Sequence, residues 1–217
     1  MIEAVVSDFG GVLTTPLMGA YTRIQDDVDV PLDAYAKAFA HSMERDGEHP
    51  LYALERGEIT EAEFLARLER GVAAVLGRAV PLHGFGERLM SALHPNSRLL
   101  DYYRRLRSRG IRLAMCTNNV REWEPLWRAK LPIDELFEVV VDSAFVGTRK
   151  PEPEIYAITP KRLDLPGQAC AFVDDLEVNV AAAREAGMHG IHFRDTAQAL
   201  AELEDLLQFS QPSRSQQ

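Results

Sequence analysis

Short apolar runs alternate with longer amphipathic segments over much of this chain of 217 residues. Apolar runs bounded by glycine or polar residues predict buried strands, whereas apolar positions that recur every three to four residues predict helices. The predicted strands are Ile2–Ser7, Ile111–Cys116, Phe137–Val141, Ala169–Val173 and Gly190–Phe193. The helices predicted to alternate with the later strands are Ser97–Arg109, Arg121–Lys130, Pro151–Leu163, Glu177–Ala186 and Ala197–Leu207. This alternation indicates an α/β fold with a parallel, doubly wound sheet.

One long stretch between the first and second predicted strands has helical patterns only. Thr60 and Glu63 form a capping box at the start of one of these helices. The predicted helices are Leu17–Val28, Leu32–Arg45, Glu61–Leu76 and Phe85–Leu93. We therefore predict an α/β core from residues 1–15 and 95–208, an all-helical cap domain at 16–94 inserted into it, and a disordered tail at 209–217.

Composition and charge narrow the classes of partner. The formal net charge is -9 and there are no basic runs, which argues against nucleic acid and membrane as principal partners. The two cysteines, Cys116 and Cys170, form no CxxC pair and lie in or beside apolar runs, which is typical of buried thiols in a reducing compartment. The N-terminus does not resemble a signal peptide. We expect a cytoplasmic monomer or homodimer that acts on a small molecule.

Four polar clusters lie where the predicted strands end or where the next helix begins. They are centred on Asp8, Thr117, Lys150 and the pair Asp174-Asp175. In an open α/β sheet the ligand crevice lies beyond the carboxyl ends of the strands, so we expect these side chains to meet there. Singly, each has a simpler explanation: an aspartate can cap a helix or stabilise a turn, and a lysine can be a solvated charge.

Together the four clusters predict phosphoryl chemistry. Carboxylate oxygens suit Mg²⁺, and the cation would offset the repulsion among three aspartates. A phosphate could bridge this metal, the Lys150 ammonium, the Thr117 hydroxyl and backbone amides around Phe9, Gly10 and Gly11. Asp8 could then attack phosphorus and form an aspartyl phosphate that water hydrolyses.

The same residues resemble the motifs of the haloacid dehalogenase superfamily. VVSDFGGVL is similar to its first motif, CTN to the second, GTRKPEPEIY to the third and FVDDLEVNVAAAREAGM to the fourth. The helical insert after the first motif resembles the type 1 cap, and LERGEITEAEFLARL is similar to the subgroup that includes the N-terminal phosphatase domain of soluble epoxide hydrolase. The resemblance implies a Rossmann-like core, a Mg²⁺ cofactor and phosphatase activity.

The resemblance also implies residue roles. Asp8 would be nucleophile and metal ligand, with the Gly10 carbonyl and Asp175 as further ligands and Asp174 a ligand directly or through water. Thr117 and Asn118 would hold the phosphate, and Lys150 would neutralise it while orienting Asp8. Asn179 would support the loop of the fourth motif or simply occupy a polar position on its helix.

Gly10 departs from the pattern of most phosphatases of this superfamily, which carry an acid at this position as general acid to the leaving group and as base to water. General acid–base catalysis contributes about a hundred- to ten-thousandfold, so its loss would slow turnover strongly. Three explanations are open: a cap residue supplies the proton, the substrate has a good leaving group, or the protein binds phosphorylated ligands with weak activity. The cap residues considered are His41, His49, Glu44 and Glu48.

The sequence thus favours a Mg²⁺-dependent phosphatase of a small phosphorylated metabolite. The enzymatic alternative is a 2-haloacid dehalogenase, in which Asp8 attacks carbon without metal; the extra charge of Asp174 and Asp175 argues against it. A phosphomutase is disfavoured because it depends on the acid missing at Gly10.

Overall fold

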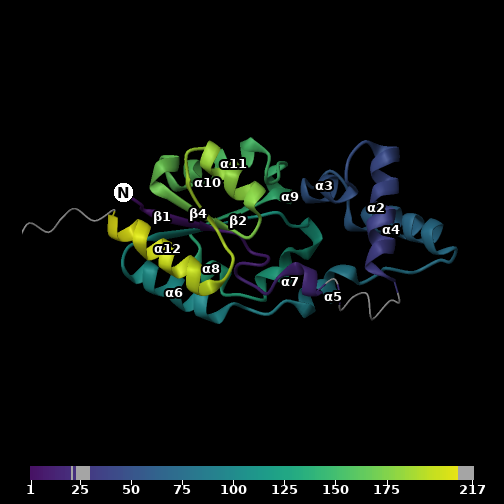
Figure 1. Ribbon diagram of the computed structural model, residues 1–217, viewed down its shortest axis with the longest axis horizontal. Coiled ribbons are helices and arrows are strands. Elements are labelled where there is room, and N and C mark those ends of the chain that lie inside the picture. The colour runs from purple at the N-terminus through teal and green to yellow at the C-terminus, as the bar shows by residue number, and fades with distance from the viewer. Residues whose placement is uncertain (21, 23–29, 210–217) are drawn as a thin grey trace, which may run out of the picture.

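A computed structural model describes residues 1–20, 22 and 30–209. Its described residues contain a five-stranded sheet in the order β3-β2-β1-β4-β5, in which all neighbouring strands are parallel (Figure 1). The first strand along the chain is therefore the central one. The strands are β1 (Ala4–Ser7), β2 (Arg112–Thr117), β3 (Val139–Asp142), β4 (Cys170–Asp174) and β5 (His189–His192).

Side chains alternate strictly between the two faces of the sheet, and both faces are buried. On β1, Val5 joins the larger apolar cluster, whereas Ala4 and Val6 join the smaller one. Helices α6 and α12 cover the first face, and α10 and α11 cover the second (Figure 1). Burial on both faces explains why the strands read as continuous apolar runs.

The helices after the insert, from α6 onward, alternate with the remaining strands, as in a doubly wound fold. The longer ones are α6 (Ser97–Ser108), α10 (Pro153–Leu163), α11 (Glu177–Glu185) and α12 (Thr196–Phe209). The shorter ones are η1 (Arg121–Trp123), α7 (Glu124–Arg128), α8 (Ile133–Leu136), α9 (Ser143–Val146) and η2 (Gly167–Ala169).

The insert between β1 and β2 is helical wherever it has regular structure among its described residues, and it lies beyond one end of the sheet (Figure 1). Helices α2 and α4 pack against each other. Gly71 lies at their crossing, where a Cβ atom would be 2.9 Å from Cβ of Ala38. A glycine in mid-helix thus allows a close approach of two backbones. The helices are α2 (Leu32–Asp46), α3 (Pro50–Glu55), α4 (Glu61–Leu76) and α5 (Phe85–Ala92).

The two segments that join the insert to the sheet run side by side in opposite directions. Thr14 and Pro95 form an antiparallel bridge. The Thr15 amide donates to the His94 carbonyl at 2.8 Å, and the Asn96 amide donates to the Leu13 carbonyl at 2.8 Å. The domain boundaries that we predict, after residue 15 and after residue 94, lie next to this bridge on its insert side.

The predicted α/β class with its parallel sheet is confirmed, and most predicted elements lie within two residues of the observed ones. The predicted helix at 121–130 is shorter, because a 3₁₀ turn precedes α7 and Pro125 lies in its first turn. Helices α3, α8 and α9 were not predicted, since each spans too few residues to show a periodicity.

Two predictions fall wholly or partly outside the described residues. Residues 17–20 and 22 of the predicted helix Leu17–Val28 are helical, and the remainder of that helix is not described. The same applies to the predicted tail beyond residue 209. Among the described residues, no helix combines the length and apolar character that crossing a membrane requires.

We predict that Thr60→Ala destabilises the protein by about 1 kcal/mol. The Thr60 hydroxyl accepts from the Glu63 amide at 3.2 Å, and the Glu63 carboxylate accepts from the Thr60 amide at 2.9 Å, so the substitution breaks a complete capping box. Urea denaturation measures the change. Ser91→Ala, which removes an exposed hydroxyl on α5, is the control and should shift stability by less than about 0.5 kcal/mol. Equal effects of the two substitutions would contradict the assignment.

Candidate active site

The predicted polar clusters converge at the carboxyl edge of the sheet. Asp8 follows β1, and its amide donates to the Val173 carbonyl of β4 at 2.9 Å. Thr117 ends β2 and Asp174 ends β4, on either side of the central strand. The parallel register thus brings together side chains that lie more than 160 residues apart in the sequence.

Lys150 is the centre of the cluster. Its Nζ lies 2.6 Å from Asp8 Oδ1 and 2.6 Å from Asp174 Oδ2. The Lys150 side chain is 2% exposed and that of Asp174 is fully buried, so these charges have little solvent to screen them. Because each charge is desolvated, the three groups depend on one another.

A third carboxylate completes an acidic cluster. Oxygen atoms of Asp8, Asp174 and Asp175 lie within 4.8 Å of one another. Three carboxylates against the one ammonium of Lys150 leave a formal charge of about -2 when all are ionised. Hard oxygen ligands with a surplus of negative charge fit a divalent cation such as Mg²⁺.

The electrostatics reflect burial opposed by pairing. Burial raises the pKa of Asp8 to about 7, with the charges of Asp174 and Asp175 acting in the same direction and the Lys150 ammonium opposing them. Burial also raises the pKa of Asp175, and the charge of Asp174 adds to this effect. Burial alone would lower the pKa of Lys150, but the carboxylates of Asp174 and Asp8 outweigh it and hold this pKa above its ordinary value. Lys150 is therefore an ammonium ion here.

Two amide side chains fix the loops that carry these charges. The Asn118 side chain donates to the Lys150 carbonyl at 2.9 Å and accepts from the Lys150 amide at 2.8 Å. Asp174 Oδ1 accepts from the Leu176 amide at 2.9 Å and from Asn179 Nδ2 at 3.0 Å. The Asn118 side chain thus orients the backbone of Lys150, and Asn179 supports the loop after β4.

Gly11 allows the acidic cluster to close. It has a φ of +82°, and a Cβ atom there would collide with the carboxylate of Asp175. At Gly10 the space for a side chain is tight, because a Cβ atom would lie 3.1 Å from Leu17 Cδ1. An apolar side chain from the start of the insert thus lies beside the position at which the family pattern has an acid.

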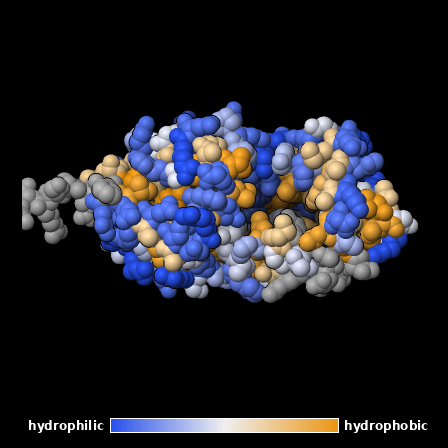
Figure 2. Space-filling view, viewed as in Figure 1, coloured by the Kyte–Doolittle hydropathy of each residue, from blue (hydrophilic) through white to orange (hydrophobic). Residues whose placement is uncertain are grey.

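A cavity of about 430 Å³ opens between the sheet edge and the insert. Its polar residues include Asp8, Thr117, Asn118, Lys150 and Asp175. Figure 2 shows hydrophobic residues in the hollow between the two parts of the molecule. Its apolar lining comprises Phe9, Pro16, Leu17, Met18, Leu51, Leu89, Met90, Val120, Trp123 and Leu176. Charge is thus concentrated at the sheet end, and the opposite wall is mainly apolar.

One ion pair in the wall of the cavity was not predicted from the sequence. Arg149 Nε donates to Glu55 Oε2 at 2.5 Å, and both side chains are 13% exposed. The Arg149 guanidinium also lies 3.9 Å from the centre of the Tyr52 ring. This pair joins α3 of the insert to the loop that carries Lys150. Glu55 lies in the segment LERGEITEAEFLARL, but its position relative to the apolar residues there does not indicate that it faces the site.

The cap residues considered as proton donors do not line this cavity. His41 and Glu44 are exposed on α2. His49 Nδ1 accepts from the Leu51 amide at 3.2 Å at the start of α3, and burial lowers the pKa of His49. Glu48 binds Arg56 at 2.8 Å. His49 and Glu48 therefore stabilise the insert, and these four candidates give no donor at the site.

A family model described as a haloacid dehalogenase-like hydrolase matches residues 2–187. The chain belongs to this family of hydrolases, as its parallel sheet and its lysine–aspartate cluster indicate. The resemblance stated from the four motifs is thus confirmed.

Several curated proteins are similar to this chain. Acyl-CoA dehydrogenase family member 10 of Mus musculus is 30% identical over 95% of the chain, and bifunctional epoxide hydrolase 2 of Rattus norvegicus is 28% identical over 94%. The chain spans only 19% and 38% of the lengths of these relatives. Sesquiterpene phosphatase astK of Aspergillus oryzae is 33% identical over 53% of the chain, and the match covers 59% of its length.

Solved structures share the fold. A HAD family enzyme of Bacteroides thetaiotaomicron, in complex with magnesium and inorganic phosphate, has a TM-score of 0.65 and 22% identity, covering 92% of this chain and 99% of its own. The L-2-haloacid dehalogenase RSc1362 has a TM-score of 0.68 and 21% identity, covering 97% and 99%. At these identities the likeness shows the fold, and chemistry must be argued from the site.

We predict that metal-free protein loses stability as pH rises from about 4 to 7, and that Asp8→Asn reduces this loss. The pKa of Asp8 is raised from 3.8 to about 7, so in this range the folded chain binds the proton more tightly than the unfolded chain. The free energy of unfolding then falls with pH, by up to about 1.4 kcal/mol per unit for one proton. Urea denaturation at several pH values measures both slopes, and identical slopes would contradict the prediction.

Proposed function

We propose that the protein is a Mg²⁺-dependent phosphatase that hydrolyses a small phosphorylated metabolite through an aspartyl phosphate on Asp8. The observation that carries the proposal is the cluster in which Lys150 contacts both Asp8 and Asp174 at 2.6 Å while Asp175 lies beside them. A nucleophilic carboxylate, a fixed ammonium and surplus negative charge are what metal-assisted phosphoryl transfer requires.

The metal would be held by Asp8, Asp175 and the backbone carbonyl of Gly10. Asp174 would act through water, since its two oxygens already accept from Lys150, Leu176 and Asn179. The bound Mg²⁺ would supply positive charge against the phosphoryl oxygens. The Bacteroides enzyme solved with magnesium and inorganic phosphate has the same fold, which supports this assignment.

The chain's own groups would bind and orient the phosphate. Thr117 lines the cavity beside Lys150, so its hydroxyl and the ammonium can both bind phosphoryl oxygens. Backbone amides at Phe9, Gly10, Gly11 and Asn118 would add further donors. The side chain of Asn118 is hydrogen-bonded to the backbone of Lys150. Asn118 would therefore bind the phosphate through its backbone amide, or act indirectly by positioning Lys150.

The reaction has two displacements at phosphorus. Asp8 forms a bond from its carboxylate oxygen to phosphorus, and the bond to the leaving oxygen breaks with its electron pair on that oxygen. Water then attacks the same phosphorus, and the bond to Asp8 breaks so that the carboxylate is restored. Lys150 holds Asp8 in position and neutralises the negative charge that gathers in both steps.

The apolar wall of the cavity favours an organic group with apolar surface on the phosphate. The cavity of about 430 Å³ can enclose a small molecule, and its far side is lined by residues such as Leu51, Leu89 and Trp123. The similarity to a sesquiterpene phosphatase over part of the chain is compatible with such a substrate.

The dehalogenase alternative has support from the shared fold but not from the charges of the site. Without a cation, attack on carbon would leave Asp8, Asp174 and Asp175 together against one ammonium. Such a surplus of buried negative charge is costly, and a divalent cation removes the cost. Release of chloride from a 2-haloacid, with no need for metal, would favour this alternative.

We predict that Mg²⁺-dependent hydrolysis of an aryl phosphate falls by about a thousandfold or more in Asp8→Asn. Asp142→Asn is the matched control, because Asp142 is also a buried aspartate at a strand end, but it caps α9 and does not line the cavity. Steady-state assays with EDTA-treated protein, with and without added Mg²⁺, measure the effect. Turnover in the Asp8 variant, or equal turnover without metal, would refute the proposal.

A further inference from the structure

The geometry of phosphoryl transfer places a requirement on the side of the cavity opposite Asp8. Attacking and leaving oxygens lie roughly in line across phosphorus, so the leaving oxygen faces away from the sheet edge and toward the insert. An alkoxide or phenolate leaving there at neutral pH needs a proton. The donor must therefore come from the wall that the insert provides.

The sheet side offers no suitable acid. Gly10 has no side chain, and Leu17 occupies the space beside it. Among the described residues that line the cavity, the carboxyl groups are those of Asp8, Asp175 and Glu55. The described lining contains no histidine, cysteine or tyrosine. Since Asp8 and Asp175 belong to the acidic cluster, Glu55 is the carboxyl group that remains for proton transfer among the described lining residues.

Glu55 is held rigidly with respect to the nucleophile. It ends α3, and its carboxylate is 2.5 Å from Arg149 Nε. Lys150 directly follows Arg149 in the chain, and its ammonium lies 2.6 Å from Asp8 Oδ1. An acid on the insert is thus tied to the attacking carboxylate through two consecutive side chains.

We propose that Glu55 is the general acid–base of this site, taking the role for which Gly10 has no side chain. The proposal rests on the proposed function. In the first displacement the Glu55 carboxyl donates its proton to the leaving oxygen as that oxygen receives the electron pair of its broken bond to phosphorus. In the second, the resulting carboxylate accepts a proton from the attacking water while Asp8 is released.

The surroundings of Glu55 allow it to carry a proton. Burial raises its pKa and nearby Glu152 acts in the same direction, while Arg149 and Lys150 oppose them, with a net upward shift. The aromatic ring of Tyr52 covers the other side of Arg149. A bound phosphate adds negative charge to the cavity, and like charge favours the protonated carboxyl further.

The test compares two substrates that differ in their need for a proton. Phenyl phosphate releases a phenolate, which resembles the tyrosine side chain with its pKa of about 10. Acetyl phosphate releases a carboxylate, which resembles the much more acidic Asp and Glu side chains with their pKa values of about 4. We expect Glu55→Gln to lower kcat/KM for phenyl phosphate by about a hundredfold. For acetyl phosphate the loss should stay below about threefold, because its leaving group needs no proton.

Glu48→Gln is the matched control. Glu48 is likewise a glutamate of the insert that forms an ion pair, with Arg56 at 2.8 Å, but it does not line the cavity. This variant should keep the wild-type ratio of the two kcat/KM values. Gly10→Asp combined with Leu17→Ala should restore phenyl phosphate turnover to Glu55→Gln, since it supplies an acid from the sheet side and the space that the acid needs.

The outcomes separate the two proposals. If Glu55→Gln leaves both substrates unaffected, or slows both equally, Glu55 only fastens the insert and the inference fails. If the wild-type protein with Mg²⁺ hydrolyses neither substrate, the proposed phosphatase function fails and this inference fails with it. A selective loss on phenyl phosphate that Gly10→Asp with Leu17→Ala restores would establish proton transfer.

Discussion

The buried ammonium of Lys150, shared between Asp8 and Asp174, is the interaction on which the arrangement of the site depends. Removing one partner of a buried ion pair typically costs about 3–5 kcal/mol, because the remaining charge has no solvent to receive it. Lys150 comes from the loop before α10, and its partners come from the ends of β1 and β4. One cation thus fixes three chain segments, and Asn118 fixes the cation's own backbone.

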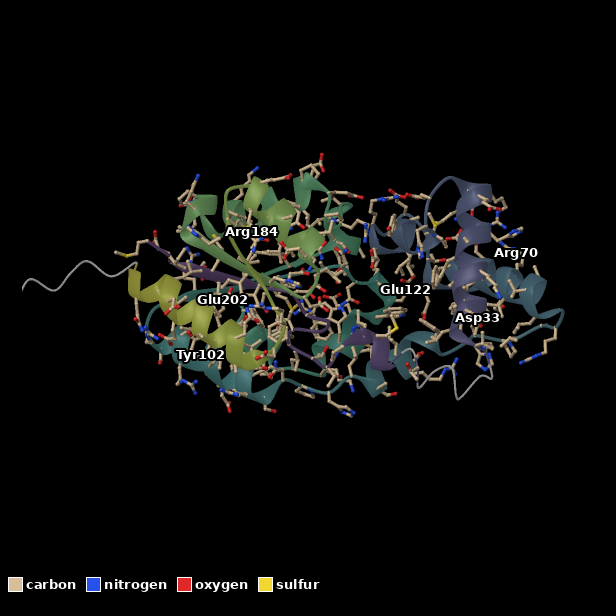
Figure 3. The ribbon with its side chains drawn as sticks, viewed as in Figure 1. Asp33, Arg70, Tyr102, Glu122, Arg184 and Glu202 are labelled. Carbon is tan, nitrogen blue, oxygen red and sulfur yellow. The ribbon has the colours of Figure 1, made fainter. Side chains whose placement is uncertain are left out.

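The insert completes what the sheet edge begins. The sheet supplies nearly all the charge of the cavity, and the insert supplies most of the apolar wall together with Glu55. Three polar contacts join the two parts. Arg149 binds Glu55, and Glu152 binds Arg56. Glu122, labelled in Figure 3 between the two parts, accepts from the Glu61 amide at the start of α4. Both the shape and the chemistry of the cavity therefore depend on how the insert is seated.

The sequence reveals most of the fold and the charged half of the site for one physical reason. Buried strands read as apolar runs, and in a parallel sheet every polar residue that ends such a run arrives at the same edge. Asp8, Thr117 and Asp174 could be located in this way, and Lys150 joined them through its place before α10.

Glu55 could not be found by the same reasoning. Its partner Arg149 lies 94 residues away, and their contact depends on how the insert is seated, which no local periodicity encodes. Helix α3, which presents Glu55, has six residues and too few turns to show an apolar face. His41 and His49 were candidates because of their chemistry alone. The sequence does not show that His41 is exposed on α2 or that His49 caps α3.

The bridge between Thr14 and Pro95 has a consequence for how such proteins diversify. Because the chain leaves the sheet and returns to it at neighbouring points, both ends of the insert are attached at one place. An insert of different length could be joined at the same two points without moving β1 or β2, because the entropic cost of closing a loop grows only slowly with its length. Lineages with this topology can exchange the chemistry that recognises the substrate while the lysine–aspartate cluster is inherited intact.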